Sequence, residues 1–157
     1  MRKWLSSILI LIASVLFTLP ALAEEPVYTG FFSNKALDGY DTVAYFSHSR
    51  AMKGKSEFKL EYMGADWYFS SKGNMDKFKA NPSKYAPQYG GYCAWAIAEK
   101  NDFASGDPEQ WTIVDDKLYI NYNRDIQNKW LKNVPKFIAQ GNKNWPMLFK
   151  KNNINNE

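Results

Sequence analysis

Residues 58–69, FKLEYMGADWYF, decide the fold predicted for this chain. Residues 58–62 alternate apolar and polar side chains, which is the pattern of a strand with one buried face. Residues 63–66 contain a glycine and an aspartate, which favour a turn, and residues 67–69 supply a returning strand of aromatic side chains. The stretch therefore predicts a β-hairpin.

A second hairpin and several short helices are predicted around the first hairpin. Residues 111–114 and 118–122 are apolar strands on either side of a polar turn at residues 115–117. Asp41 and Asn123 are expected to cap helices, because their side chains accept hydrogen bonds from free backbone N–H groups. The helices expected are a short turn after Asp41 and residues 72–80, 92–100, 124–132, 134–140 and 144–149. This order predicts a small single domain of the α+β class, with two β-hairpins and several short helices.

The first 23 residues have the composition of a secretory signal. Arg2 and Lys3 precede an apolar run at residues 5–19, Pro20 ends it, and residues 21–23 (ALA) form a signal-peptidase site. We expect cleavage after Ala23 and a periplasmic or secreted protein. Because the run is short for a bilayer span, we expect cleavage, with an uncleaved anchor as the alternative. No later segment is apolar enough to cross a bilayer, so we expect no membrane span after cleavage.

The mature chain is expected to hold one domain. Residues 24–38 would be an extended lead-in, residues 39–149 the domain with a C-terminal extension, and residues 150–157 a polar tail. Loss of Arg2 and Lys3 with the signal lowers the net charge from +4 to +2, and no Lys/Arg cluster marks a nucleic-acid surface. We therefore expect no nucleic-acid partner, and the sequence identifies no protein partner.

Aromatic residues make up 17% of the chain, which is a high share for a small domain. Rings bury large areas with few rotatable bonds, so they suit a compact domain that has no disulfide. We interpret these side chains as an aromatic core rather than as a binding cage.

Four stretches carry a resemblance to a known family. They are residues 39–46 (GYDTVAYF), 57–85 (EFKLEYMGADWYFSSKGNMDKFKANPSKY), 85–96 (YAPQYGGYCAWA) and 105–130 (SGDPEQWTIVDDKLYINYNRDIQNKW). Together they resemble the YHS-domain family, and within it the secreted branch that has a C-terminal extension. The family is related to the metal-binding YHS/TRASH-like superfamily. The resemblance runs from Gly39 to about Trp145.

The resemblance also implies where a metal site would lie. The metal-binding members have a cysteine after Asp-Pro-Val and two more in a Phe-Cys-x-x-x-Cys run, and thiolates are soft ligands for copper or zinc. The matching positions in this chain are Ala44, Ser70 and Asn74, so all three thiols are replaced. This departure argues against transferring the cysteine-rich site, and leaves Ser70 the role of a helix cap.

Cys93, the single cysteine, has three open interpretations. In the first, it is a metal ligand joined by His48 and a methionine, because thiolate, imidazole and thioether together suit copper. In the second, it is a small buried side chain at a helix start, packed beside Gly90 and Gly91. In the third, a helix N-terminus lowers its pKa and makes it a reactive thiolate. The methionines considered are Met52, Met63 and Met75, and His48 lies in a segment expected to be a polar loop, residues 47–56.

No catalytic motif accompanies these residues. The sequence has no CxxC pair, no G-x-S-x-G, no phosphate-binding loop and no H-E-x-x-H. We therefore predict a binding module of the bacterial envelope that is not an enzyme, with Cys93 and His48 as candidate metal ligands and copper as the favoured metal. The alternatives are a structural or protein-interaction domain that binds no metal and, last, a thiol-dependent enzyme.

Overall fold

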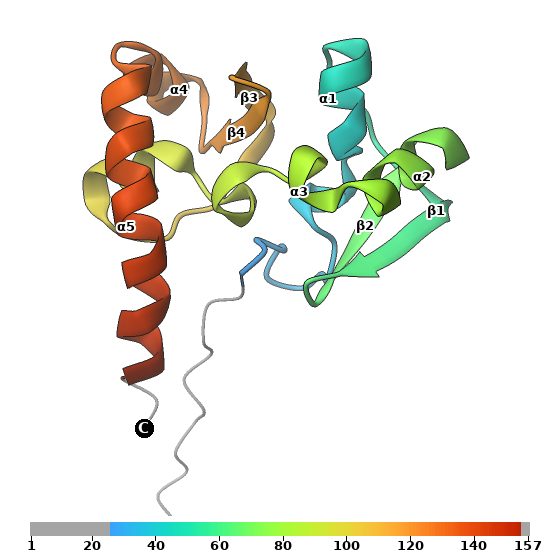
Figure 1. The fold of residues 1–157 in the computed structure, drawn as a ribbon, viewed down its shortest axis with the longest axis horizontal. Helices are drawn as coiled ribbons and strands as arrows, with labels where there is room; N and C mark the ends of the chain where they lie inside the picture. The colour runs from blue at the N-terminus through green and yellow to red at the C-terminus, as the bar shows by residue number, and fades with distance from the viewer. Residues whose placement is uncertain (1–25, 155–157) are drawn as a thin grey trace, which may run out of the picture.

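The computed structural model describes residues 26–154 and confirms the α+β class, with two separate two-stranded antiparallel sheets among short helices. The signal segment expected at residues 1–23 lies outside the described residues. Figure 1 shows the first hairpin with α1 and α2 on one side of the molecule, the long helix α5 on the other, and the second hairpin between them. The described elements are η1 (Leu37–Gly39), α1 (Thr42–His48), β1 (Lys55–Tyr62), β2 (Ala65–Phe69), α2 (Lys72–Ala80), α3 (Pro82–Tyr85), η2 (Gln88–Gly91), η3 (Ala96–Lys100), β3 (Asp107–Val114), β4 (Lys117–Asn121), α4 (Arg124–Leu131) and α5 (Val134–Ile154).

The first hairpin has the alternation that the sequence predicted. β1 pairs with β2 so that Leu60 faces Trp67 and Tyr62 faces Ala65. Every second side chain of β2 is buried, while its neighbours are half-buried. α2 covers the buried face with Phe78, whose ring centroid lies 4.8 Å from that of Trp67. One core cluster thus forms between this hairpin and α2.

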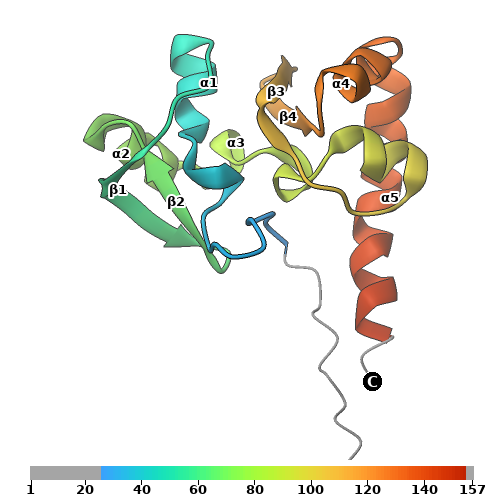
Figure 2. The ribbon, with the colours of Figure 1, turned by 180° about the vertical axis from the view of Figure 1, so that it is seen from behind.

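The second half is built on β3, β4, α4 and α5. Tyr119 of β4 and Trp130 of α4 are buried with ring centroids 5.3 Å apart. They belong to a second core cluster that also takes in Ile97 of η3 and Leu148 of α5. Figures 1 and 2 both show α5 running along the outside of this half, beside the η3 segment.

A third core cluster joins the two halves. It contains Leu37 of η1, Tyr45 of α1, and Leu118 and Ile120 of β4, all at most 1% exposed. The Tyr45 hydroxyl donates to the carbonyl of Pro108 at 2.9 Å, so α1 is also tied to β3 by a hydrogen bond. This shared core holds the two hairpins in a fixed relationship.

The two helices predicted at residues 134–140 and 144–149 are one continuous helix, α5. This helix contains both Gly141 and Pro146. At Gly141 a Cβ atom would lie 2.5 Å from the Tyr89 hydroxyl, so the glycine gives room for a ring instead of ending the helix. The polar tail expected from residue 150 is likewise helical as far as Ile154.

Other boundaries also differ from the prediction. His48 is the last residue of α1 rather than part of a loop, and β3 begins at Asp107, before the strand predicted at residues 111–114. The lead-in is not fully extended, because a turn follows Gly30 and η1 begins at Leu37. The helix expected at residues 92–100 is a π-helix, η3, preceded by one short helical turn.

Candidate functional site

Asp41 is a fully buried carboxylate at the start of α1. Its Oδ1 atom accepts hydrogen bonds from the backbone N–H groups of Val43 at 2.9 Å and Ala44 at 3.2 Å, which confirms the predicted helix cap. A buried charge is costly unless hydrogen bonds satisfy it, and these two bonds satisfy only one of its oxygen atoms.

The second oxygen of Asp41 is bonded across the fold to the start of α2. Oδ2 accepts from the backbone N–H of Ser70 at 2.8 Å, from the Ser70 hydroxyl at 2.6 Å and from the Asn74 amide at 2.7 Å. Ser71, not Ser70, is the N-cap of α2, since its hydroxyl accepts from the backbone N–H of Asn74. Ser70 therefore joins α2 to α1 through the carboxylate instead of capping a helix.

The three positions at which the resemblance places cysteines in metal-binding relatives thus meet at one carboxylate. Ala44 contributes a backbone N–H, and Ser70 and Asn74 contribute side-chain donors. This donor set is directed at Asp41 and offers no soft ligand, so it does not fit copper or zinc. Within residues 26–154, no group of three or more His, Cys, Asp or Glu side chains could hold a metal ion.

Cys93 lies in the core between η2 and η3, with 1% of its surface exposed. It forms a parallel bridge with Ile120 of β4, and its thiol donates to the Asn121 Oδ1 atom at 3.8 Å. Burial raises the pKa of the Cys93 thiol, although nearby backbone N–H groups partly oppose this. The structure therefore supports the buried side chain among the three interpretations, since a raised pKa keeps the sulfur protonated.

His48, the second candidate ligand, is exposed at the end of α1. Its Nδ1 atom lies 2.8 Å from the Ser47 hydroxyl. The structure does not bring the imidazole to Cys93, which instead bonds Asn121. The methionines are also dispersed: Met52 precedes β1, Met63 lies in the β1–β2 turn and Met75 lies on α2.

A pocket with a volume of about 390 Å³ lies where the first hairpin, η2 and α5 meet. Its walls include the rings of Tyr62, Trp67, Tyr89 and Trp145, which come from four different segments. The remaining lining residues are Pro26, Val27, Met63, Ser83, Ala86, Pro87, Gln88 and Gly90. None of the lining residues is an aspartate, glutamate, lysine, arginine or histidine, so the pocket offers apolar and neutral polar groups.

The polar atoms of two pocket rings are held by the protein. The Trp67 Nε1 atom donates to the Tyr62 carbonyl at 2.8 Å. The Tyr89 hydroxyl donates toward the Asn142 Oδ1 atom at 3.0 Å, and burial raises its pKa well above the ordinary tyrosine value. These bonds fix the orientation of both rings, which are buried, so the accessible aromatic wall of the pocket is offered by the half-buried rings of Tyr62 and Trp145.

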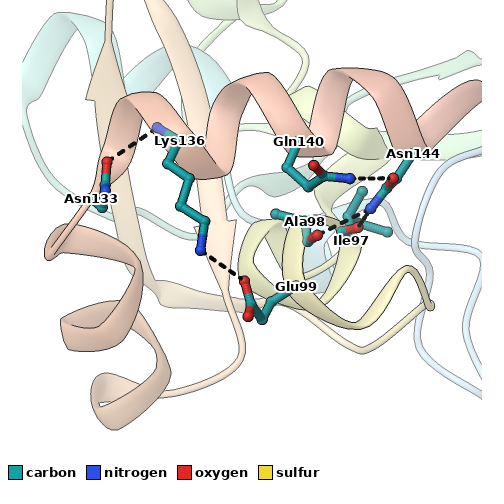
Figure 3. Close-up of polar contacts among 7 residues, drawn as sticks. All are labelled: Ile97, Ala98, Glu99, Asn133, Lys136, Gln140 and Asn144. Atoms are coloured by element: carbon teal, nitrogen blue, oxygen red, sulfur yellow. Dashed lines mark hydrogen bonds and ion pairs between the residues drawn. The ribbon is translucent and has the colours of Figure 1, made fainter.

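The wall formed by α5 is fixed to η3, as Figure 3 shows. The buried Asn144 amide donates to the carbonyls of Ile97 at 2.9 Å and Ala98 at 3.0 Å. In a π-helix each backbone hydrogen bond spans five residues instead of the four of an α-helix. The Asn144 side chain, which belongs to another helix, satisfies the carbonyls of Ile97 and Ala98. Lys136 and Glu99 add an exposed ion pair at 3.6 Å. Trp145, the next residue after Asn144, is thereby held at the pocket.

The sequence did not predict this pocket. Its four rings are separated along the chain and were assigned to the core with the other aromatic residues. The signal available was the high aromatic content, but a count of rings does not show which of them line a surface.

Comparison with known proteins matches residues 43–89 to the model of the YHS domain family. Searches of curated proteins and of solved structures gave no match. The resemblance to the YHS domain is therefore confirmed for a segment that runs from α1 to η2, and the YHS domain indicates a module of metal-binding type. No helix in the described part of the chain is long and apolar enough to cross a bilayer.

Proposed function

We propose that this chain, which carries a YHS domain at residues 43–89, is an exported, non-enzymatic binding module whose ligand is a small, uncharged, apolar or aromatic molecule. The ligand would occupy the pocket between the first hairpin and α5. The observation that carries the proposal is the lining of this pocket, which combines four aromatic rings with no charged side chain.

The size and chemistry of the pocket support this ligand class. A volume of about 390 Å³ is within the range of small-molecule sites, which are mostly apolar with a few neutral polar groups. A charged ligand would lose its hydration without gaining a counter-ion, which is unfavourable. A flat ligand would instead stack against the half-buried rings of Tyr62 and Trp145, and each aromatic contact adds about 0.5–1.5 kcal/mol beyond the area buried.

The exported part of this proposal rests on the sequence. The predicted signal at residues 1–23 would deliver the module to the periplasm or outside the cell. Mass spectrometry of the protein recovered from its natural compartment tests this step, and we expect a mature N-terminus at Glu24. An N-terminus that still contains residues 1–23 would contradict export with cleavage.

Soft-metal binding through Cys93 and His48 stays a prediction, and the structure gives it little support. The Cys93 thiol is buried against Asn121, and the His48 ring is exposed on α1. A copper ion at Cys93 would need a second soft donor, and none of the three methionines lies on the η2–η3 segment that carries this sulfur. We therefore favour the pocket over the thiol as the binding site.

The proposal is tested with the neutral fluorophore N-phenylnaphthylamine and a matched pair of variants. Ser83 is an exposed residue of α3 that lines the pocket, so its substitution does not disturb the core. We expect wild-type protein and Ser83→Ala to bind the probe equally, and Ser83→Trp to bind it roughly tenfold more weakly because the indole fills the pocket, a loss of about 1.4 kcal/mol. Equal binding by all three proteins, or no binding by the wild type, would overturn the proposal.

A Cu(I) titration of the same protein separates the metal alternative. Cys93→Ser would lower Cu(I) affinity if the sulfur were a ligand, and would leave binding of the fluorophore unchanged. We expect no change in Cu(I) affinity on this substitution. A loss of tight Cu(I) binding in Cys93→Ser, together with weak fluorophore binding by the wild type, would favour soft-metal handling instead.

A further inference from the structure

Gln88, the first residue of η2, is one of the residues that line the pocket between the first hairpin and α5. Its side chain is half-buried. Within residues 26–154, no hydrogen bond joins its carboxamide to another residue, so this group is free to bond a molecule in the pocket.

Other polar side chains of the pocket lining are already bonded within the protein. The Ser83 hydroxyl donates to the Asn81 Oδ1 atom at 3.0 Å. The Trp67 Nε1 atom and the Tyr89 hydroxyl also donate to protein oxygen atoms. A ligand that used one of these groups would have to replace a bond that the folded chain already makes, whereas a bond to the Gln88 carboxamide would replace only bonds to solvent.

The backbone on both sides of Gln88 is fixed by packing and by hydrogen bonds. Its neighbours Pro87 and Tyr89 are both buried. The Tyr28 N–H donates to the Gly90 carbonyl at 2.9 Å, so the lead-in segment holds η2 in place. The carboxamide is therefore carried by a rigid segment, which is what precise recognition of a polar group requires.

A ligand that fills the pocket would remove solvent from the Gln88 carboxamide. Loss of the hydrogen bonds to water is unfavourable unless the ligand replaces them. A carboxamide presents an N–H donor beside a carbonyl acceptor, so its complement is a group with the same pair in the reverse order. A lactam or a second carboxamide is such a group, and both are neutral, as the uncharged lining of the pocket requires.

We propose that Gln88 is a specificity-determining residue that selects aromatic lactams and aryl carboxamides among the ligands of this pocket. This inference rests on the proposed function, because it requires the pocket to bind a neutral aromatic molecule. The amide pair would hold one edge of the ligand while its ring contacts the half-buried rings of Tyr62 and Trp145. Sites that bond a polar group of the ligand reject analogues without that group more strongly than apolar sites reject a change in size.

Displacement of N-phenylnaphthylamine by two bicyclic molecules of similar size tests this inference. Carbostyril is a lactam, and naphthalene has no hydrogen-bonding group. Gln88→Met removes the carboxamide and keeps the length of the side chain. We expect the affinity for carbostyril to fall roughly fivefold in Gln88→Met, as for the loss of one net hydrogen bond, and the affinity for naphthalene to stay unchanged. The thermal unfolding midpoint should also stay unchanged, since the carboxamide bonds no residue in the described part of the chain.

Two further variants of the pocket lining are matched controls. Ser83→Ala removes a hydroxyl that already bonds Asn81, so it should change neither affinity. Tyr62→Phe removes the hydroxyl of a pocket ring and keeps the ring itself, so it should leave the affinity for carbostyril close to that of the wild type.

The outcomes separate this inference from the proposed function. If the wild type binds the fluorophore but Gln88→Met changes the affinities for carbostyril and naphthalene equally, or changes neither, the selection by Gln88 is wrong and the proposed function stands. A loss of carbostyril binding in Tyr62→Phe instead of Gln88→Met would overturn the inference in the same way. If the wild type does not bind the fluorophore, both the proposed function and the role of Gln88 are wrong.

Discussion

The Asn74 amide of α2 donates a 2.7 Å hydrogen bond to the buried carboxylate of Asp41, which is 33 residues away and caps α1. Because Ser70 bonds the same oxygen atom, one side chain organises the starts of two helices. The carboxylate accepts five hydrogen bonds in all, from three backbone N–H groups and two side chains. The donors of this cluster lie inside the segment that matches the YHS domain, residues 43–89, and Asp41 lies just before it.

Substitution of Asp41 by alanine should destabilise the fold strongly. The change leaves five donors without their shared acceptor, and breaking a buried charged network by removing one partner costs about 3–5 kcal/mol. The free energy of unfolding, measured by urea titration, should fall by that amount. Asp76→Ala is the control, because Asp76 makes only an exposed ion pair with Lys72 and its loss should cost at most about 1 kcal/mol. Similar losses for the two variants would show that the network is not a stabilising cross-link.

Cys93 should react slowly with a maleimide in the native protein and quickly in denaturant. Cys93 is 1% exposed, and its raised pKa keeps the thiolate scarce at neutral pH. The same shift has a consequence for stability. The folded state retains the thiol proton more tightly than the unfolded chain, so the Cys93 contribution is present below the ordinary thiol pKa and is lost as pH rises through the raised value.

The buried tyrosines also titrate at high pH, so the contribution of Cys93 must be isolated by difference. Wild type and Cys93→Ala should differ less in free energy of unfolding at alkaline pH than at neutral pH. Rapid labelling of the native protein at neutral pH would contradict the buried position of the thiol.

Substitution of Asn144 by leucine should destabilise the contact between α5 and η3. Leucine fills a similar volume but leaves the carbonyls of Ile97 and Ala98 without their donor, and each buried unsatisfied group costs about 1–3 kcal/mol. Thermal unfolding should show a lower midpoint, and affinity for the pocket fluorophore should fall because Trp145 loses its support. Lys143→Leu, at an exposed neighbouring position, should change neither quantity measurably. An unchanged midpoint in Asn144→Leu would mean that α5 packs without these bonds.

Two glycine-to-alanine substitutions should have opposite effects. At Gly106 a Cβ atom would lie 2.1 Å from the Gly91 carbonyl oxygen, so alanine must displace backbone and we expect a loss of roughly 2 kcal/mol or more. At Gly73, in α2, the nearest atom is 3.9 Å away, and alanine should stabilise the helix by about 0.5–1 kcal/mol. Chemical denaturation of both variants checks the signs. Stabilisation by Gly106→Ala would show that this close approach is not required.

The local parts of the fold could be predicted from the sequence, because they depend on short patterns. Alternation identified the first hairpin, and the caps Asp41 and Asn123 were both found at helix starts. The continuity of α5 could not be found in this way, and the close approach of Tyr89 to Gly141 within this helix joins residues that are distant in sequence.

The candidate sites were likewise predicted only in part. The resemblance identified Ala44, Ser70 and Asn74, but the carboxylate that joins them was recognised only as a cap. The pocket was missed because its rings are brought together by tertiary structure, and the role of Ser70 was wrong because its partner lies on another helix. Whether Cys93 and His48 bind a metal stays a prediction that the titration described above can test.

The Asp41 cluster has a consequence for how the protein matures. The hydrogen bonds that join α1 to α2 are formed by side chains of the polypeptide itself. This connection therefore forms when the chain folds, without an added ion. A cell starved of transition elements, or a medium that contains a strong chelator, should therefore yield as much correctly assembled protein as a replete one.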